Sequence, residues 1–267
     1  MHQGFFWQIC YNARSGVLEV RKLMTDVQVY EQYAVVPKET GSRLLARLDY
    51  LKIEPKVILD LGCRTGEFTQ LLKSRYPNAM VIAVDASFNM LSHVQKKQSW
   101  FKKQPMVQSW VTTLPFQNES IDLIFANQCF LDVKDFVSLF AELQRIMTPN
   151  GCLMFSSLGP DTLKEIEGRP TYMDLHDIGD ALLQCGFQDP VMDREDICLH
   201  YSSMEKMQTA LIAQGLWVDG QLMHAFANKY PLSYEIIYGH AWRGKMKRKD
   251  QSQVISIAQL KQSLQKK

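Results

Sequence analysis

The sequence predicts an α/β fold in which helices cover both faces of a doubly wound, mostly parallel sheet. Three observations predict it. Apolar runs of strand length stand at 57–61, 80–84 and 121–126, helical patterns lie between them, and glycine or aspartate ends the first two runs. Strands that alternate with helices form βαβ units, and right-handed crossovers wind such units into a parallel sheet.

Each further element has its own local signal. Apolar side chains recur every three or four residues from Phe136 to Ile146, which indicates one buried helix face. Pro149 and Gly151 end that helix. The expected strands are 57–61, 80–84, 108–112, 121–126, 152–156, 191–201 and 233–240, and the expected helices are 67–75, 89–98, 136–146, 175–185 and 204–216. The helix at 204–216 resembles an insertion, so we expect one domain with a cap.

Composition excludes several classes of protein. The 267 residues are 46% hydrophobic and 22% charged, which is ordinary for a globular chain. No apolar run approaches the ~18 residues of a membrane span, and the first residues lack the pattern of a signal peptide. The six cysteines form no CxxC pair and have no zinc-site spacing. We therefore expect a cytoplasmic protein without a membrane segment or a metal.

Positive charge is concentrated at the end of the chain. Residues 243–267 hold eight Lys/Arg and the single acid Asp250, against a net charge of +2 for the whole chain. A solvated end explains such a segment, and so does a docking patch for an acidic partner. Nucleic acid is disfavoured, because no aromatic-rich binding motif accompanies the charge.

Two loops after predicted strands have the residues of a nucleoside site. The first, DLGCRTG at 60–66, places Gly62 and Gly66 just before a helix N-terminus, where a backbone can approach a ligand. It lacks the third glycine of a dinucleotide fingerprint, which disfavours a nicotinamide-dependent oxidoreductase. The second loop begins at Asp85, whose carboxylate can accept hydrogen bonds from ribose hydroxyls or cap the next helix. Both roles are compatible.

Several longer phrases resemble a known family. VILDLGCRTG, VIAVDAS, LPFQNESIDLIFANQ and LQRIMTPNGCLMFSSLGPDTL are similar to the motifs of class I S-adenosylmethionine-dependent methyltransferases. YEQYAVVPKETGSRLLARL, HDIGDALLQCGFQDPVMD and YGHAW resemble the BioC family, malonyl-[acyl-carrier protein] O-methyltransferases of biotin synthesis. The resemblance spans about 20–242. It implies a seven-stranded Rossmann-like sheet with an N-terminal cap and a C-terminal helical insertion.

The resemblance also implies a domain plan. A single methyltransferase domain covers 20–242, with a cofactor half at 56–158 and substrate or cap elements at 20–55 and 159–242. An N-terminal extension at 1–19 and the basic tail at 243–267 flank it.

The implied reaction moves the methyl group of S-adenosylmethionine to the free carboxylate of malonyl-acyl carrier protein. A carboxylate is already ionised at neutral pH, so the reaction needs no general base and no metal, and the catalytic residue is unknown. Placement and exclusion of water are expected to carry catalysis. Matching positions imply that the cofactor is bound by Tyr30, Asp60, Gly62, Gly66, Asp85, Ala86 and Asn127. Tyr30 is equally explained as a half-buried aromatic.

Three departures from the family pattern fall on the cofactor side. Arg64 stands where the family has a glycine, and a left-handed backbone there would cost an arginine about 1–2 kcal/mol. Trp110 stands where an acid usually accepts the adenine amino group, and Leu131-Asp132 replaces a Gln-Trp pair. A divergent paralogue with weak or lost cofactor binding and a methyltransferase of small molecules are therefore the alternatives.

The acceptor carboxylate requires a cation or hydrogen-bond donors. Candidates in the family-like stretches are Arg43, Arg169, His176, His240 and Arg243, and the sequence assigns none of them a role.

Overall fold

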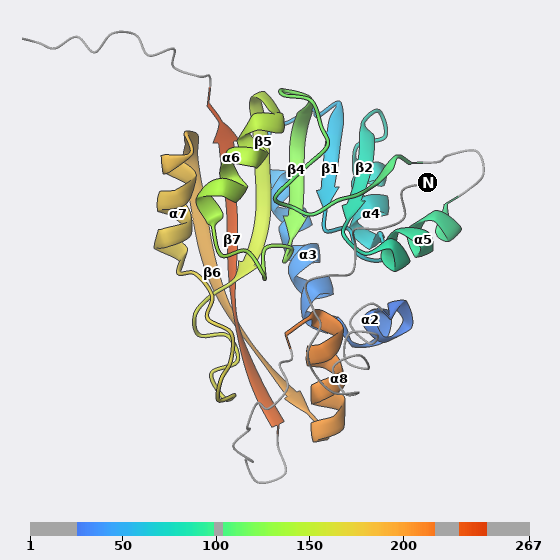
Figure 1. The fold of residues 1–267 in the computed structure, drawn as a ribbon, viewed down its shortest axis with the longest axis vertical. Coiled ribbons are helices and arrows are strands. Elements are labelled where there is room, and N and C mark those ends of the chain that lie inside the picture. Colours follow the sequence, from blue (N-terminus) through green and yellow to red (C-terminus); the bar gives the residue numbers. More distant parts are fainter. Residues whose placement is uncertain (1–25, 99–103, 217–229, 245–267) are drawn as a thin grey trace, which may run out of the picture.

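The computed structural model describes residues 26–98, 104–216 and 230–244. In these ranges seven strands form one sheet in the order β3-β2-β1-β4-β5-β7-β6, with helices on both faces (Figure 1). The strands are β1 (Val57–Leu61), β2 (Met80–Asp85), β3 (Met106–Gln108), β4 (Ile121–Asn127), β5 (Met147–Leu158), β6 (Phe187–Tyr201) and β7 (Tyr230–Arg243). The helices are α2 (Val27–Tyr33), α3 (Val35–Arg47), α4 (Glu67–Arg75), α5 (Phe88–Lys97), α6 (Phe136–Ile146), α7 (Leu175–Gln184) and α8 (Met204–Gln214), with a short 3-10 helix at Leu48–Tyr50.

The sheet confirms the predicted doubly wound, mostly parallel fold. Strands β3, β2, β1, β4 and β5 are parallel neighbours. Strand β7 enters between β5 and β6 and is antiparallel to both. Strands β2 and β3 are added on one side of β1, whereas β4 and β5 are added on its other side, so the strand order reverses between β1 and β4. Ligands of open α/β sheets bind at the carboxyl ends of the strands beside such a switch point.

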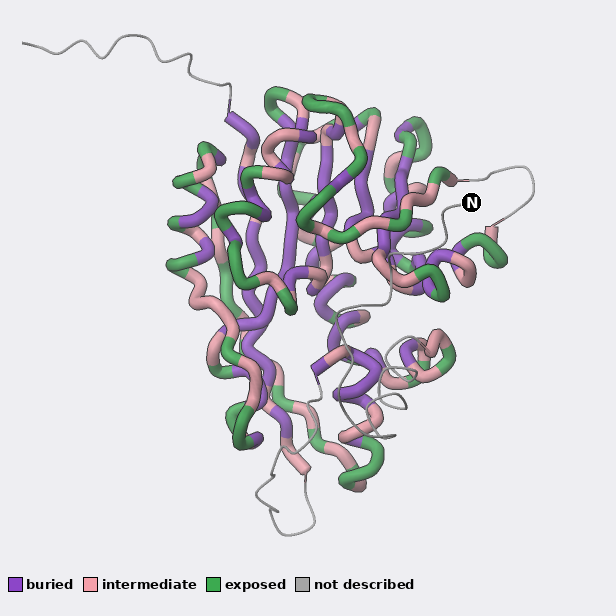
Figure 2. Tube along the Cα trace, viewed as in Figure 1, coloured by how far each residue is buried: buried purple, intermediate pink, exposed green. Residues whose placement is uncertain are grey.

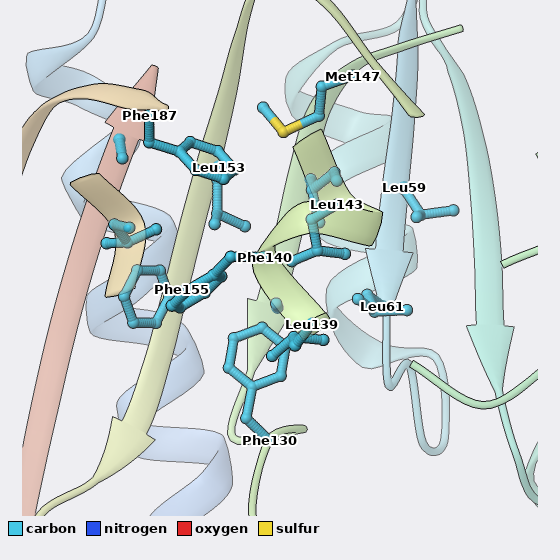
Figure 3. Packing of buried hydrophobic residues seen from close by; sticks show 14 of the residues in the cluster. Leu59, Leu61, Phe130, Leu139, Phe140, Leu143, Met147, Leu153, Phe155 and Phe187 are labelled. Atoms are coloured by element: carbon cyan, nitrogen blue, oxygen red, sulfur yellow. The ribbon is translucent and has the colours of Figure 1, made fainter. Parts of the chain in front are cut away.

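One face of the sheet is covered by α6 and α7. The apolar stripe of α6 is buried, with Leu139, Phe140 and Leu143 0% exposed. Figure 3 shows these side chains packed among residues of β1 and β5, such as Leu61 and Phe155. Asp135 fixes the start of α6, because its carboxylate accepts a hydrogen bond from the Ser138 backbone N–H at 2.9 Å.

The opposite face is covered by α3, α4 and α5. Apolar side chains of α3 and α4 pack with those of β1, β4 and β5, while Leu91 and Val94 of α5 pack on Ala83 of β2. Strands β1 and β4, which lie between these layers, are buried along most of their length (Figure 2). These buried central strands therefore fix the positions of the loops that follow their carboxyl ends.

Helices α2 and α8 lie beyond the carboxyl ends of the parallel strands and contact each other (Figure 1). They are the N-terminal cap and the C-terminal helical insertion that the sequence predicts. No helix of the described ranges is long and apolar enough to cross a membrane.

The third strand differs from its predicted position at 108–112. Strand β3 is Met106–Gln108, paired with β2 from Ala83 to Asp85. The chain then turns, because the Thr113 N–H donates to the Trp110 carbonyl at 3.2 Å and the Ser109 hydroxyl donates to the Thr113 carbonyl at 2.6 Å. The β-propensity of this segment is overridden by those local turn bonds.

The basic tail begins later than predicted. Arg243 is the last residue of β7 and is 4% exposed. Its guanidinium donates to the Met147 carbonyl at 2.6 Å and pairs with Glu119 at 2.8 Å. Arg243 therefore belongs to the sheet, and the tail from 245 onward lies outside the described residues, as does the extension at 1–19.

Candidate active site

The loop between β1 and α4 is shaped by three residues with a left-handed backbone. The φ angles are +74° at Gly62, +49° at Arg64 and +76° at Gly66. The N–H groups of Gly62 and Cys63 donate to the Val84 carbonyl at 2.8 and 2.9 Å, so the loop is anchored to β2. The two glycines therefore stand where the sequence analysis requires them, and Arg64 occupies a glycine-favouring conformation.

Asp85 ends β2 and organises the same edge. Its side chain is 5% exposed, and its two oxygens accept hydrogen bonds from the backbone N–H groups of Ser87 at 2.8 Å and Arg64 at 2.9 Å. Each carboxylate oxygen has further lone pairs. Asp85 can therefore hold a ribose diol while it joins the loop at 62–66 to the start of α5, which is N-capped by Ser87.

A cavity of about 710 Å³ lies beside Asp85. It is lined by Gly62 and Arg64 of the first loop, Ala86 after β2, Trp110 after β3 and Gln128 after β4, and by residues at the end of α8. Ligand pockets commonly occupy about 300–1,000 Å³. The cavity therefore has room for an adenosyl ligand and part of an acceptor.

Asp60 lies within β1 beneath the loop and is 2% exposed. The Thr69 hydroxyl of α4 donates to its carboxylate. Burial, together with the negative charge of Asp85, raises the pKa of Asp60 to about 7. Asp60 therefore joins the strand to the helix whose N-terminus faces the site, and its carboxyl is partly protonated at neutral pH.

Asp60→Asn is expected to flatten the pH dependence of folding stability between about pH 4 and 7. A folded-state pKa of about 7, above the ordinary 3.8, means that ionising this carboxyl destabilises the folded protein as pH rises through that window. The wild type should lose up to about 4 kcal/mol relative to the variant. Denaturant unfolding of both proteins at several pH values measures the difference, and a difference that does not change with pH would contradict the assignment.

Asn127, at the end of β4, forms hydrogen bonds with α3. Its amide donates to the Pro37 carbonyl at 2.8 Å, and its oxygen accepts from the hydroxyls of Thr40 at 3.2 Å and Ser156 at 2.7 Å. Gly41 permits this approach, because a β-carbon there would lie 2.7 Å from the Asn127 amide nitrogen. Asn127 therefore fixes α3 to the sheet, and its cofactor contact stays a prediction.

A second, smaller cavity of about 20 Å³ lies next to the same loop. Tyr30 of α2, Asp60, Gly62 and Asn127 line it, and Gly62 and Arg64 line both cavities. Tyr30 is 7% exposed, and burial, opposed by the positive charge of Arg64, raises the pKa of Tyr30 to about 12. The tyrosine is thus buried over the loop as a neutral hydroxyl, and its contact with a cofactor also stays a prediction.

The seven predicted cofactor residues differ in which of the two cavities they line. Gly62, Asp85 and Ala86 line the large cavity, while Tyr30, Asp60 and Asn127 line the small one with Gly62. Gly66 lines neither cavity. It allows the loop to pack closely against α5, because a β-carbon there would lie 2.8 Å from Val94.

All three departures from the family pattern line the large cavity, Arg64 among them. Trp110 is 63% exposed at its rim, and Leu131 and Asp132 line it. Sequence analysis missed Gln128, Cys129, Lys134 and Gln214, which also line it. Gln128 and Cys129 follow Asn127, the last residue of β4, and their place just after a strand was the signal that could have identified them. Gln214 reaches the cavity only through the tertiary position of α8.

The five candidates for binding the acceptor carboxylate lie elsewhere in the described part of the molecule. Arg43 pairs with Glu39 and Glu195, Arg169 donates to the Thr162 carbonyl, and His176 sits beside its helix cap Asp174. His240 lies within β7 opposite Val191, and Arg243 is held as described above. The cations that line the two cavities are Arg64, Lys38 and Lys134. Among the described residues, no group of three or more side chains is placed to hold a metal ion.

The sheet order, the glycine loop after β1 and the acid after β2 define a class I methyltransferase with a Rossmann-like fold. Residues 59–155 match a family described as a methyltransferase domain. The fold is similar to that of YcgJ from Bacillus subtilis, with a TM-score of 0.58 and 13% identity over 76% of this chain and 99% of that chain. It is also similar to phosphoethanolamine N-methyltransferase 2 of Haemonchus contortus solved with S-adenosyl-L-methionine, with a TM-score of 0.58 and 14% identity over 83% of this chain and 57% of that chain.

Sequence relatives identify the particular family. The chain is 40% identical over 252 residues to the malonyl-[acyl-carrier protein] O-methyltransferase of Legionella pneumophila, covering 83% of this chain and 89% of that protein. It is 35% identical to malonyl-[acyl-carrier protein] O-methyltransferase 1 of Coxiella burnetii, covering 83% and 86%. The chain belongs to the family of malonyl-[acyl-carrier protein] O-methyltransferases.

Proposed function

We propose that this protein transfers the methyl group of S-adenosylmethionine to the free carboxylate of malonyl-acyl carrier protein, for biotin synthesis in the cytoplasm. The observation that carries the proposal is the large cavity, which is lined by Asp85 and by Gly62 and Arg64 of the first loop. The Arg64 N–H donates to the Asp85 carboxylate, and the chain belongs to this family. The five cysteines of the described residues are free thiols, which suits a reducing compartment.

The residues present fit the cofactor. Asp85 provides a buried carboxylate with spare acceptor capacity for ribose hydroxyls, and Ala86 lies next to it on the wall where an adenine would lie. S-adenosylmethionine bound there would supply a methyl group on a positively charged sulfur. Its transfer to a carboxylate oxygen, with the carbon–sulfur bond breaking, would release a neutral thioether and would require no proton transfer.

The work of the protein is to place the two reactants and exclude water. Leu131 and Val133 give the cavity apolar walls next to the polar edge formed by Asp85 and Gln128. Helix α8 contributes Gln214 to the wall of this cavity, and α2 packs against α8. Orientation and desolvation of this kind account for large rate accelerations without a catalytic acid or base.

We propose acyl carrier protein as the partner. Carrier proteins are acidic, and residues 245–267 hold seven Lys/Arg with one acid. Arg243 is buried in the sheet and is left out of this count. Residues 245–267 lie outside the described ranges, so the support comes from their charge and from the names of the relatives.

The test is a methyl-transfer assay with purified protein, S-adenosylmethionine and two thioester-loaded carrier proteins. Malonyl-carrier protein should gain one methyl ester, detected by intact-protein mass spectrometry. Acetyl-carrier protein is the matched control, because it lacks the free carboxylate and should stay unmodified. Transfer to malonate or a small malonyl thioester, with none to the carrier-bound form, would instead favour a small-molecule enzyme. No transfer and no binding of S-adenosylhomocysteine would favour a paralogue that has lost the activity.

A further inference from the structure

Arg64 is held in its place at a conformational cost. Its φ angle of +49° lies in the left-handed region, which disfavours any residue with a β-carbon. The backbone is locked there, because the Arg64 N–H donates to the Asp85 carboxylate at 2.9 Å. The side chain therefore projects from a fixed point between the two cavities, both of which it lines.

The guanidinium group of Arg64 has no hydrogen-bonded or ion-paired partner within the described ranges. Its central carbon lies over the Tyr30 ring, 5.8 Å from the ring centre, at the outer limit of a cation–π contact. The contact with Asp85 is made by the backbone N–H and not by the side chain. The five N–H donors of this half-buried cation are therefore available to a ligand in the cavities that Arg64 lines.

Neighbouring cations suit this role less well. Lys38, the other cation of the small cavity, already donates from its ammonium group to the Glu31 carbonyl at 2.5 Å. Lys134, the other cation of the large cavity, is a point charge without a planar donor fork. Asp60 is bonded to Thr69 and partly protonated. The planar donor fork of an arginine matches a carboxylate in a bidentate pair better than any other side chain.

We infer that Arg64 binds a ligand carboxylate, and that this carboxylate is the one on the methionine tail of the cofactor. The inference rests on the proposed function. Arg64 is bonded to the acid that would hold the ribose, and the methionine tail extends from that ribose through its sulfur. The small cavity is too narrow for the tail, so the tail lies in the large cavity along Gly62 with its carboxylate on Arg64.

The acceptor also has a carboxylate, so the carboxylate bound by Arg64 could come from the acceptor or from the cofactor. A bidentate pair occupies both oxygens of a carboxylate. That arrangement suits a group that is bound and does not react, whereas one oxygen of the acceptor carboxylate has to attack the methyl carbon. The observations therefore favour the cofactor tail.

The experiment compares S-adenosylhomocysteine with its decarboxylated analogue, which retains the adenosine and the amino group. The wild type should bind S-adenosylhomocysteine about 10- to 100-fold more tightly than the analogue, as calorimetry measures. Arg64→Met should lower that ratio to within about threefold of one by weakening only the carboxylate ligand. Arg64→Gly, which also relieves the backbone strain, should do the same and keeps the test valid where the methionine variant fails to fold.

Arg75→Met is the matched control, because it removes an arginine that pairs with Asp49 at the far end of α4 and should leave the ratio unchanged. An Arg64 variant that binds S-adenosylhomocysteine as tightly as the wild type, or more tightly, would show that the arginine crowds the site and would overturn the inference. An unchanged ratio with a tenfold higher KM for malonyl-carrier protein would assign Arg64 to the acceptor instead. Wild-type protein that binds neither probe would contradict the proposed function as well, whereas the other two outcomes contradict the inference alone.

Discussion

Asp85→Asn should lower the affinity for S-adenosylhomocysteine by about 100-fold or more. An asparagine has one accepting oxygen, so its amide nitrogen would face one of the two N–H donors, from Arg64 or from Ser87, that the carboxylate now satisfies. The loop at 62–66 would loosen, and the ribose would lose a charged acceptor. Calorimetric titration of the folded variant measures the effect.

Asp122→Asn is the control for this experiment. Asp122 also accepts two backbone N–H bonds, from Lys56 at 2.9 Å and Val57 at 3.0 Å, but it lies at the opposite end of the strands. The control should lose stability without losing ligand affinity. Binding by Asp85→Asn within threefold of the wild type would contradict the role of Asp85.

Gly62→Ala should lower the free energy of unfolding by about 2–4 kcal/mol and abolish measurable binding of S-adenosylhomocysteine. The alanine would need a left-handed backbone, and its β-carbon would lie 2.4 Å from the Cys129 β-carbon. Either the loop or the end of β4 must therefore move, and both line the large cavity. Denaturant unfolding and calorimetry test the two parts of this prediction.

Gly168→Ala separates the clash from the backbone strain. Gly168 has nearly the same φ angle, +70°, but a β-carbon there would meet nothing within 4 Å. This variant should lose only about 1 kcal/mol and should bind the ligand normally. Equal losses of stability in the two variants would show that strain alone, without the contact with Cys129, explains the effect at Gly62.

The part of the site that follows directly from strand ends could be predicted from sequence. Gly62 and Asp85 each stand at the first position after an apolar run, and the order of strands in a doubly wound sheet places the two loops side by side. Trp110 lines the same cavity as Gly62 and Asp85, although its segment forms a turn after β3 and not a strand.

Contacts between distant segments could not be predicted in this way. The hydrogen bonds of Asn127 reach Pro37 and Thr40, about ninety positions earlier, and no local pattern encodes the packing of α3 that permits them. The same holds for Gln214, which depends on where α8 lies. The five candidates for the acceptor carboxylate were chosen by residue type within family-like stretches, and residue type does not tell whether a side chain is already paired.

Asp85 shows that one carboxylate sustains two properties of this protein. Its hydrogen bonds to Arg64 and Ser87 exist without any ligand, so the loop and the start of α5 already have their working arrangement before an encounter. Because this loop is already ordered, ligand binding would cost little conformational entropy, which favours tighter binding. Substitution of Asp85 would therefore weaken the loop and, under the proposed function, also the affinity for the nucleoside.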